Sequence, residues 1–116
     1  MAYDKGTAQR VREAMATRED VQPSDVAERK MFGGLCFMVR GNMACGVGGG
    51  TDHMMVRVGK AAYEASLAHP NAHVTSGNFR KMKGMVWIDP DGYKSDDDLQ
   101  MWIERCIANA LTLPSK

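Results

Sequence analysis

Two glycines, Gly33 and Gly34, lead directly into a run of apolar residues at 35–39, and a second glycine-rich segment follows at residues 46–50. Glycine is needed where the backbone takes a positive φ angle or where another chain segment approaches closely. At this spacing the glycines separate short apolar segments of strand length, and no catalytic side chains stand beside them. The pattern therefore indicates a sheet of short, closely connected strands and does not by itself point to a reaction.

The apolar residues of the following segments alternate as in strands. Residues 35–40 are apolar on both faces, which is typical of a central strand that is covered on both sides. We expect a tight turn at Gly41 and Asn42, a strand at residues 43–47 and another at residues 53–58, which together make an antiparallel meander. In the last of these strands the inward positions are Met54, Val56 and Val58, and the outward positions are His53, Met55 and Arg57.

Three segments have helical periodicity, and the last is the clearest. Ser95 is a good N-cap, three aspartates follow it in the first helical turn, and an apolar stripe then continues to Leu113. We expect helices at residues 7–17, 60–68 and 96–113, with further strands near residues 73–75 and at residues 84–89. The order α-β-β-β-α-β-β-α predicts one α+β domain over residues 1–116, with an antiparallel sheet in one layer and helices in the other.

The composition limits the classes of function. The net charge is +1, which argues against a dedicated nucleic-acid or membrane binder, because such proteins depend on a strongly basic surface. Three cysteines are an odd number and sit in apolar patterns, which indicates buried thiols in a reducing compartment. No apolar run is long enough to span a membrane, and no leader-like segment precedes the domain. We therefore expect a cytoplasmic protein that does not bind membranes.

Several of these features occur together in one known family. A Met-Phe-Gly-Gly segment opens the meander, a helix follows at residues 60–67, a Phe-Arg…Met-Lys-Gly segment precedes the last strand, and Trp102 lies in the terminal helix. In this order and spacing, residues 31–113 resemble the TfoX N-terminal domain family. We expect the motif residues to be structural, with Trp87 and Trp102 packing the sheet against the last helix. These motif residues are Met31, Phe32, Gly33, Gly34, Gly84, Trp87 and Trp102.

The resemblance implies a two-layer fold similar to that of secretion-chaperone-like domains. Two-domain members of the family include competence regulators, which act with the cyclic-AMP receptor protein and carry a second domain that resembles helix-hairpin-helix modules. The present sequence contains no match to that second domain, so we do not expect direct nucleic-acid binding. The family's stand-alone members have no established biochemical activity.

The leading functional hypothesis is a regulatory or adaptor module that acts by protein–protein interaction. A basic segment is the best polar candidate for the contact, and the alternative interpretation of the same segment is an ordinary solvated loop. A homodimer is also compatible with this type of fold. The residues of the candidate contact are Arg57, Arg80, Lys81, Met82 and Lys83.

The alternative hypothesis is an enzyme or a small-molecule binding domain. It would use a cleft between the sheet and the helices, where Arg57, Arg80 or Lys83 holds an anion and Tyr63 or His53 acts as an acid or base. The two hypotheses differ in geometry, because an enzyme needs these polar groups to converge in a concave pocket.

Other constellations are interpreted as structural, and we predict no metal site, no cofactor and no catalytic residue. The three histidines and three cysteines lack the spacing of a zinc site. A Cys45–His53 nucleophile pair would need an exposed thiol, whereas the alternation points Cys45 inward. No phosphate-binding helix follows residues 46–50, and residues 89–92 form a turn. The histidines are His53, His69 and His73, and the cysteines are Cys36, Cys45 and Cys106.

Overall fold

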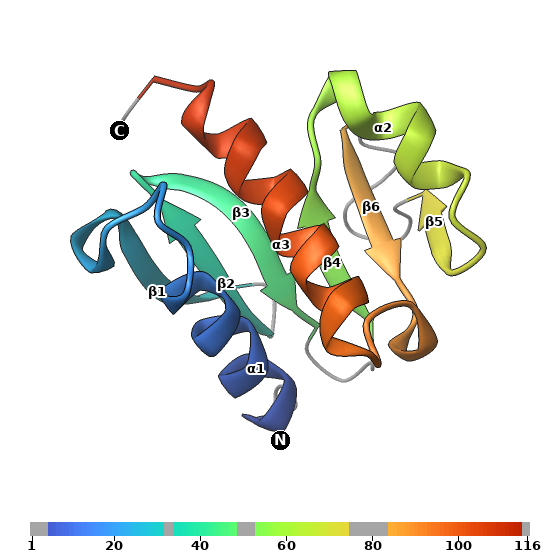
Figure 1. The fold of residues 1–116 in the computed structure, drawn as a ribbon, viewed down its shortest axis with the longest axis horizontal. Helices are drawn as coiled ribbons and strands as arrows, with labels where there is room; N and C mark the ends of the chain where they lie inside the picture. The colour runs from blue at the N-terminus through green and yellow to red at the C-terminus, as the bar shows by residue number, and fades with distance from the viewer. Residues whose placement is uncertain (1–4, 32–33, 49–52, 75–83, 115–116) are drawn as a thin grey trace.

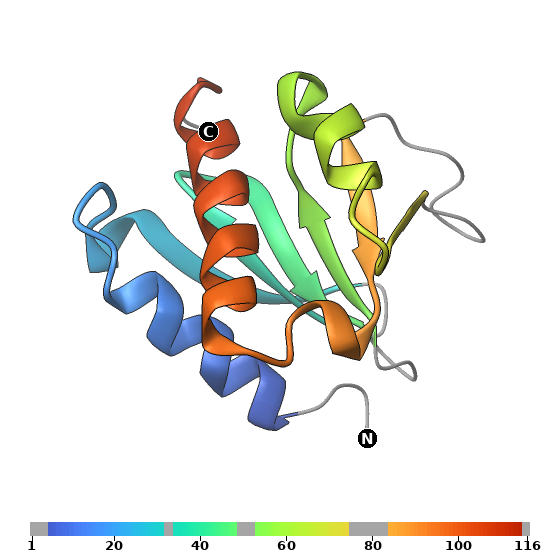
Figure 2. The ribbon, with the colours of Figure 1, turned by 45° about the vertical axis from the view of Figure 1, so that its right-hand side comes forward.

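The computed structural model describes residues 5–31, 34–48, 53–74 and 84–114. Within these ranges the chain forms one antiparallel sheet with the strand order β1-β2-β3-β4-β6-β5. The helices lie together on one face of the sheet (Figures 1 and 2). The elements are α1 (Lys5–Ala16), β1 (Val26–Met31), β2 (Gly34–Val39), β3 (Asn42–Val47), β4 (Met54–Arg57), α2 (Lys60–Leu67), β5 (Ala72–Val74), β6 (Met85–Ile88) and α3 (Asp96–Leu111).

The α+β class, the antiparallel sheet and the helical layer are confirmed. The predicted helices are present with ends that differ by one or two residues, and the strand expected near residues 73–75 is β5. Thr75 lies outside the described residues, as do Phe32, Gly33 and residues 49–52.

Residues 26–31 form a strand, β1, that the sequence pattern does not predict. It pairs with β2 along its whole length, from Val26 opposite Val39 to Met31 opposite Gly34. Its middle residues Glu28, Arg29 and Lys30 are exposed, so the strand lacks the apolar alternation by which strands are recognised in a sequence. Charged residues are common in edge strands, because they discourage uncontrolled pairing with other chains.

The turn between β2 and β3 lies one residue earlier than the sequence predicts. Arg40 has φ 52° and Gly41 has φ 83°, the positive values at both central positions that a type I′ hairpin turn requires. Asn42 is instead the first residue of β3, and it is buried. Its side-chain amide donates to the carbonyl oxygen of Pro114 at 2.9 Å, so the strand start is tied to the end of the chain's last helix.

The main core lies between the sheet and α3. Ser95 caps this helix as predicted, because its hydroxyl accepts a hydrogen bond from the amide of Asp98 at 3.1 Å. The apolar stripe of α3 is buried against β2, β3 and β4, while α1 packs beside α3 and α2 covers β5 and β6. The stripe consists of Leu99, Trp102, Ile103, Cys106, Ile107 and Ala110.

Candidate interaction surface

The face of the sheet opposite the helices carries one continuous row of residues across the six strands. Strand register places them in one line, and the sequence neighbours of those on β2, β3, β4 and β6 belong to the core on the helical side. Because successive side chains of a strand point to opposite faces, the row points away from the helices. In order from β1 to β5 it consists of Arg29, Cys36, Gly46, Met55, Trp87 and His73.

Sulfur-containing side chains form a second buried layer on this face. Met55 points outward, away from the helices, as expected, and it is nevertheless buried at 6% exposure. Gly46 lies opposite both Cys36 and Met55, and a Cβ atom there would lie 3.4 Å from both the Sγ atom of Cys36 and the Cε atom of Met55. Methionine adapts its shape readily, which suits a layer that no described helix covers. The buried members are Cys36, Met38, Met55 and Met85.

Trp87 also lies on this face, so the expectation that it packs against the last helix is wrong. It is half-buried, and its ring centroid lies 5.5 Å from that of His53. The reason is its register position: Trp87 lies opposite Met55, while its neighbours Val86 and Ile88 take the two core positions.

Two histidines converge on one carboxylate beside Trp87. The Nε2 atom of His53 lies 3.0 Å from one oxygen of Asp89, and the Nε2 atom of His73 lies 2.6 Å from the other. The hydrogen bond from His73 is the main cause of the lowered pKa of Asp89, and the nearby charge of both histidines adds to it. The cluster links His53, which precedes β4, and Asp89, which follows β6, to His73 on β5. Among the residues that the structure describes, no group of three or more His, Cys, Asp or Glu side chains could hold a metal ion.

The lowered pKa of Asp89 predicts an acid-dependent contribution to stability. A carboxyl group whose folded pKa is below its unfolded value stabilises the fold above the unfolded value, about 4, and loses this effect as the pH falls through the folded value. We therefore expect Asp89→Asn to be destabilising near neutral pH and to approach wild type below about pH 4. Urea denaturation of the wild type and of Asp89→Asn across this pH range measures the difference between their free energies of unfolding. A difference that does not change with pH would contradict the lowered pKa of Asp89.

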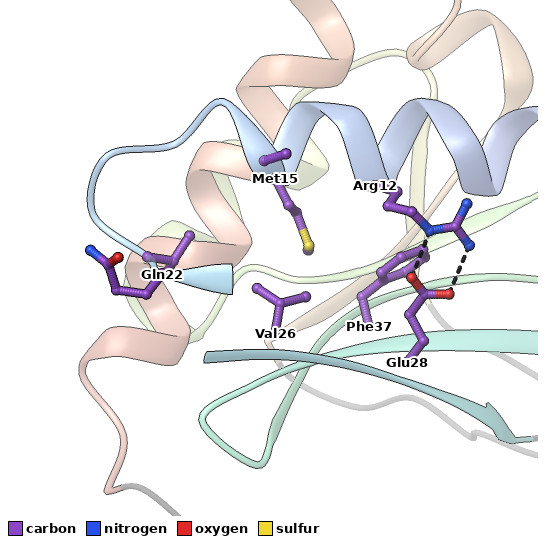
Figure 3. A pocket seen from close by; sticks show the side chains of 8 residues that line it. Arg12, Met15, Gln22, Val26, Glu28 and Phe37 are labelled. Atoms are coloured by element: carbon purple, nitrogen blue, oxygen red, sulfur yellow. Dashed lines mark hydrogen bonds and ion pairs between the residues drawn. The ribbon is translucent and has the colours of Figure 1, made fainter. Parts of the chain in front are cut away.

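A cavity of about 220 Å³ lies between α1 and the edge of the sheet. Figure 3 shows Met15 pointing down from α1 towards Val26 and Phe37, which rise from β1 and β2. Met15 and Phe37 are buried, and so is Val21 on the connection between α1 and β1. The floor of the cavity is therefore apolar.

Polar side chains mark the mouth of this cavity. Arg12 of α1 holds both carboxylate oxygens of Glu28 on β1, with its Nε and one terminal nitrogen at 2.6 and 2.7 Å (Figure 3). This paired geometry lowers the pKa of Glu28. Gln22 and Ala16 complete the rim, and like Arg12 and Glu28 they are exposed, so the opening faces solvent beside β1. Sequence reasoning missed this site, because Arg12 and Glu28 each look like ordinary surface charges in the sequence.

The residues of the predicted contact are only partly described. Arg57 is half-buried at the end of β4, opposite Met85 on β6. Gly84, which precedes Met85, has φ 98°, and its carbonyl oxygen accepts hydrogen bonds from the amides of Val58 and Gly59. The remaining members of that contact, Arg80, Lys81, Met82 and Lys83, lie outside the described residues.

The polar side chains that an enzyme or small-molecule binding site would need do not converge in the described part of the structure. Tyr63 is buried in the core under α2, on the helical side of the sheet. His53 and Arg57 are on the other side and at opposite ends of β4, about 13 Å apart along the strand. Cys45 is fully buried, as predicted, and its hydrogen bond with Cys106, together with burial, raises the pKa of its thiol. A thiol with a raised pKa is a poor nucleophile.

Comparison with known proteins gives one match. A family model described as the TfoX N-terminal domain matches residues 21–110, which include every strand of the sheet and most of α3. No curated protein and no solved structure matches the chain. In the described part of the chain, none of the helices has the length and apolar character that crossing a bilayer requires.

Proposed function

The chain belongs to the TfoX N-terminal domain family, and on this basis we propose that it is a small regulatory domain that acts by binding another protein. The observation that most favours this proposal is the exposed strand β1. It forms one edge of the described sheet and pairs with β2 along all six of its residues. A long edge strand offers a row of backbone donors and acceptors to a partner.

The state of the cysteines is consistent with a cytoplasmic location. Cys36, Cys45 and Cys106 are all buried free thiols. Disulfides are rare in the reducing cytoplasm and common in secreted domains, so three unpaired thiols fit the former. We propose that the regulatory interaction takes place there.

The basic segment remains the contact proposed from the sequence. Reversing two of its charges, with Arg80→Glu and Lys83→Glu together, is expected to abolish capture of the partner, because an acidic partner surface would then be repelled. The measurement is affinity capture of the tagged protein from its native lysate, with bound proteins quantified by mass spectrometry. Thermal unfolding of the variant is expected to stay close to wild type.

A conservative variant separates charge from side-chain bulk in this experiment. Arg80→Lys with Lys83→Arg keeps both charges, so we expect it to capture the same partner as wild type. Equal capture by the charge-reversed protein would contradict the assignment of the contact to this segment. Failure of wild type to enrich any protein over an unrelated bait would contradict the proposed function itself.

A further inference from the structure

The backbone groups of β1 that face away from β2 can be identified from its register. The amide of Arg40 donates to the carbonyl of Asp25 at 2.7 Å, which makes these two residues a hydrogen-bonded pair. In an antiparallel ladder such pairs alternate with pairs that do not exchange hydrogen bonds. Val26, Glu28 and Lys30 therefore direct their amide and carbonyl groups outward, and no described residue bonds to these groups.

The same residues direct their side chains towards the helical side of the sheet. Glu28 lies opposite Phe37, a core residue, and both Glu28 and Val26 line the cavity under α1. A strand added outside β1 would place every second side chain on this side of the sheet, next to the mouth of the cavity. The open edge of β1 and the cavity (Figure 3) thus lie side by side, and together they form one groove between α1 and β1.

The cavity is large enough for an apolar side chain. Its volume of about 220 Å³ exceeds that of cavities of about 150 Å³ that accept a molecule of benzene. In recognition by strand addition, backbone hydrogen bonds give affinity and pockets for alternate side chains give specificity. The groove between α1 and β1 offers both components.

The charges along β1 indicate the character of the added strand. Glu28 is neutralised by Arg12, whereas Arg29 and Lys30 have no ion-pair partner among the described residues. Another basic side chain near this edge, Arg40, is paired with Asp25, which precedes β1. The edge therefore presents two uncompensated positive charges.

A second copy of the chain matches the charges of this edge less well than an acidic segment does. Symmetric antiparallel pairing keeps the faces of the two sheets aligned, so the two registers that overlap most of β1 are centred on Glu28 or on Arg29. The first places Glu28 opposite Glu28, and the second places Arg29 opposite Arg29 and Glu28 opposite Lys30, so neither register gives Arg29 a negative partner.

We propose that the groove between α1 and β1 binds an extended acidic peptide segment of a partner protein, which adds a strand to β1 and inserts one apolar side chain into the cavity. This inference rests on the proposed function and specifies its partner. Acidic residues one and two positions from the apolar one, on the same side of it, face Arg29 and Lys30, so binding weakens as salt is added.

The probe is a random-peptide display library selected against the full chain. The selected peptides are expected to share one apolar residue that has Asp or Glu at the next two positions on one side. Lys30→Pro is expected to weaken their binding about tenfold, since proline removes an outward amide and its ring occupies the edge. Lys30→Thr keeps that amide and serves as the control, with only the smaller loss that removing one charge causes.

A second pair of variants tests the cavity. Ala16 is exposed at the rim, so Ala16→Trp covers the mouth without disturbing the core and is expected to weaken binding about tenfold. Ala65→Trp, at an exposed position of α2, makes the same change away from the groove and is expected to bind as wild type. Melting curves establish that all four variants are folded.

Several results would overturn this inference. They are a library that yields no binder, selected peptides without acidic enrichment, and affinities that Lys30→Pro and Ala16→Trp leave unchanged. A concentration-dependent dimer that Lys30→Pro abolishes would show that a second copy occupies the edge. None of these results decides the proposed function, which the lysate capture tests separately.

Discussion

Replacing Trp102 with alanine is expected to lower the free energy of unfolding by about 3–5 kcal/mol, the range found for large aromatic truncations in cores. Trp102 is fully buried in α3, and its indole N–H donates to the carbonyl oxygen of Gly92 at 2.9 Å. Its ring also meets the edge of His69 at 5.3 Å and lies under the guanidinium of Arg105 at the same distance. The truncation leaves a cavity in the core and also removes the hydrogen-bond donor of the buried Gly92 carbonyl, and both changes destabilise the fold.

Urea denaturation monitored by circular dichroism measures this loss. Trp87→Ala is the matched control, because Trp87 is half-buried on the face without helices and we expect a smaller loss there. A loss at Trp102 below about 1 kcal/mol, or one no larger than that at Trp87, would contradict the assigned role of α3.

Gly59→Ala is expected to cost about 2–4 kcal/mol, which combines a strained backbone with a steric overlap. Gly59 has φ 85°, a conformation that side chains disfavour. A Cβ atom there would lie 2.2 Å from Oδ1 and 2.7 Å from Cγ of Asn109 on α3. The glycine therefore lets the start of α2 approach α3 closely.

A double-mutant cycle separates the two contributions. In an Asn109→Ala background the overlap with Oδ1 and Cγ is removed, so Gly59→Ala is expected to cost only the backbone strain of about 1–3 kcal/mol. Chemical denaturation of the four proteins gives the coupling energy. The same loss in both backgrounds would mean that Asn109 does not limit this position.

Elements with an apolar face could be predicted from the sequence. The periodic apolar stripe and the Ser95 N-cap of α3 are local signals in the sequence, and burial of the stripe and the capping hydrogen bond both stabilise the helix. Strand β1 could not be predicted, because Glu28, Arg29 and Lys30 give it no apolar face. What makes it a strand is its pairing with β2, which is a property of the tertiary structure.

The functional surfaces depend even more on tertiary structure. The direction of Trp87 follows from its register opposite Met55, and Met55 in turn lies opposite Gly46 of β3. The cavity under α1 depends on how α1 crosses the sheet edge, where Arg12 and Glu28 meet. No local pattern in the sequence encodes these contacts.

The most direct test of the account is photo-crosslinking in living cells. A photoreactive residue is introduced at Lys30 on the β1 edge, at Lys81 in the basic segment, or at Ala65 on α2 as the control. We expect position 30 to form an adduct with one defined partner protein and position 65 to form none. Adducts from positions 30 and 81 no different from those at position 65 would contradict the claim that this domain acts by binding another protein.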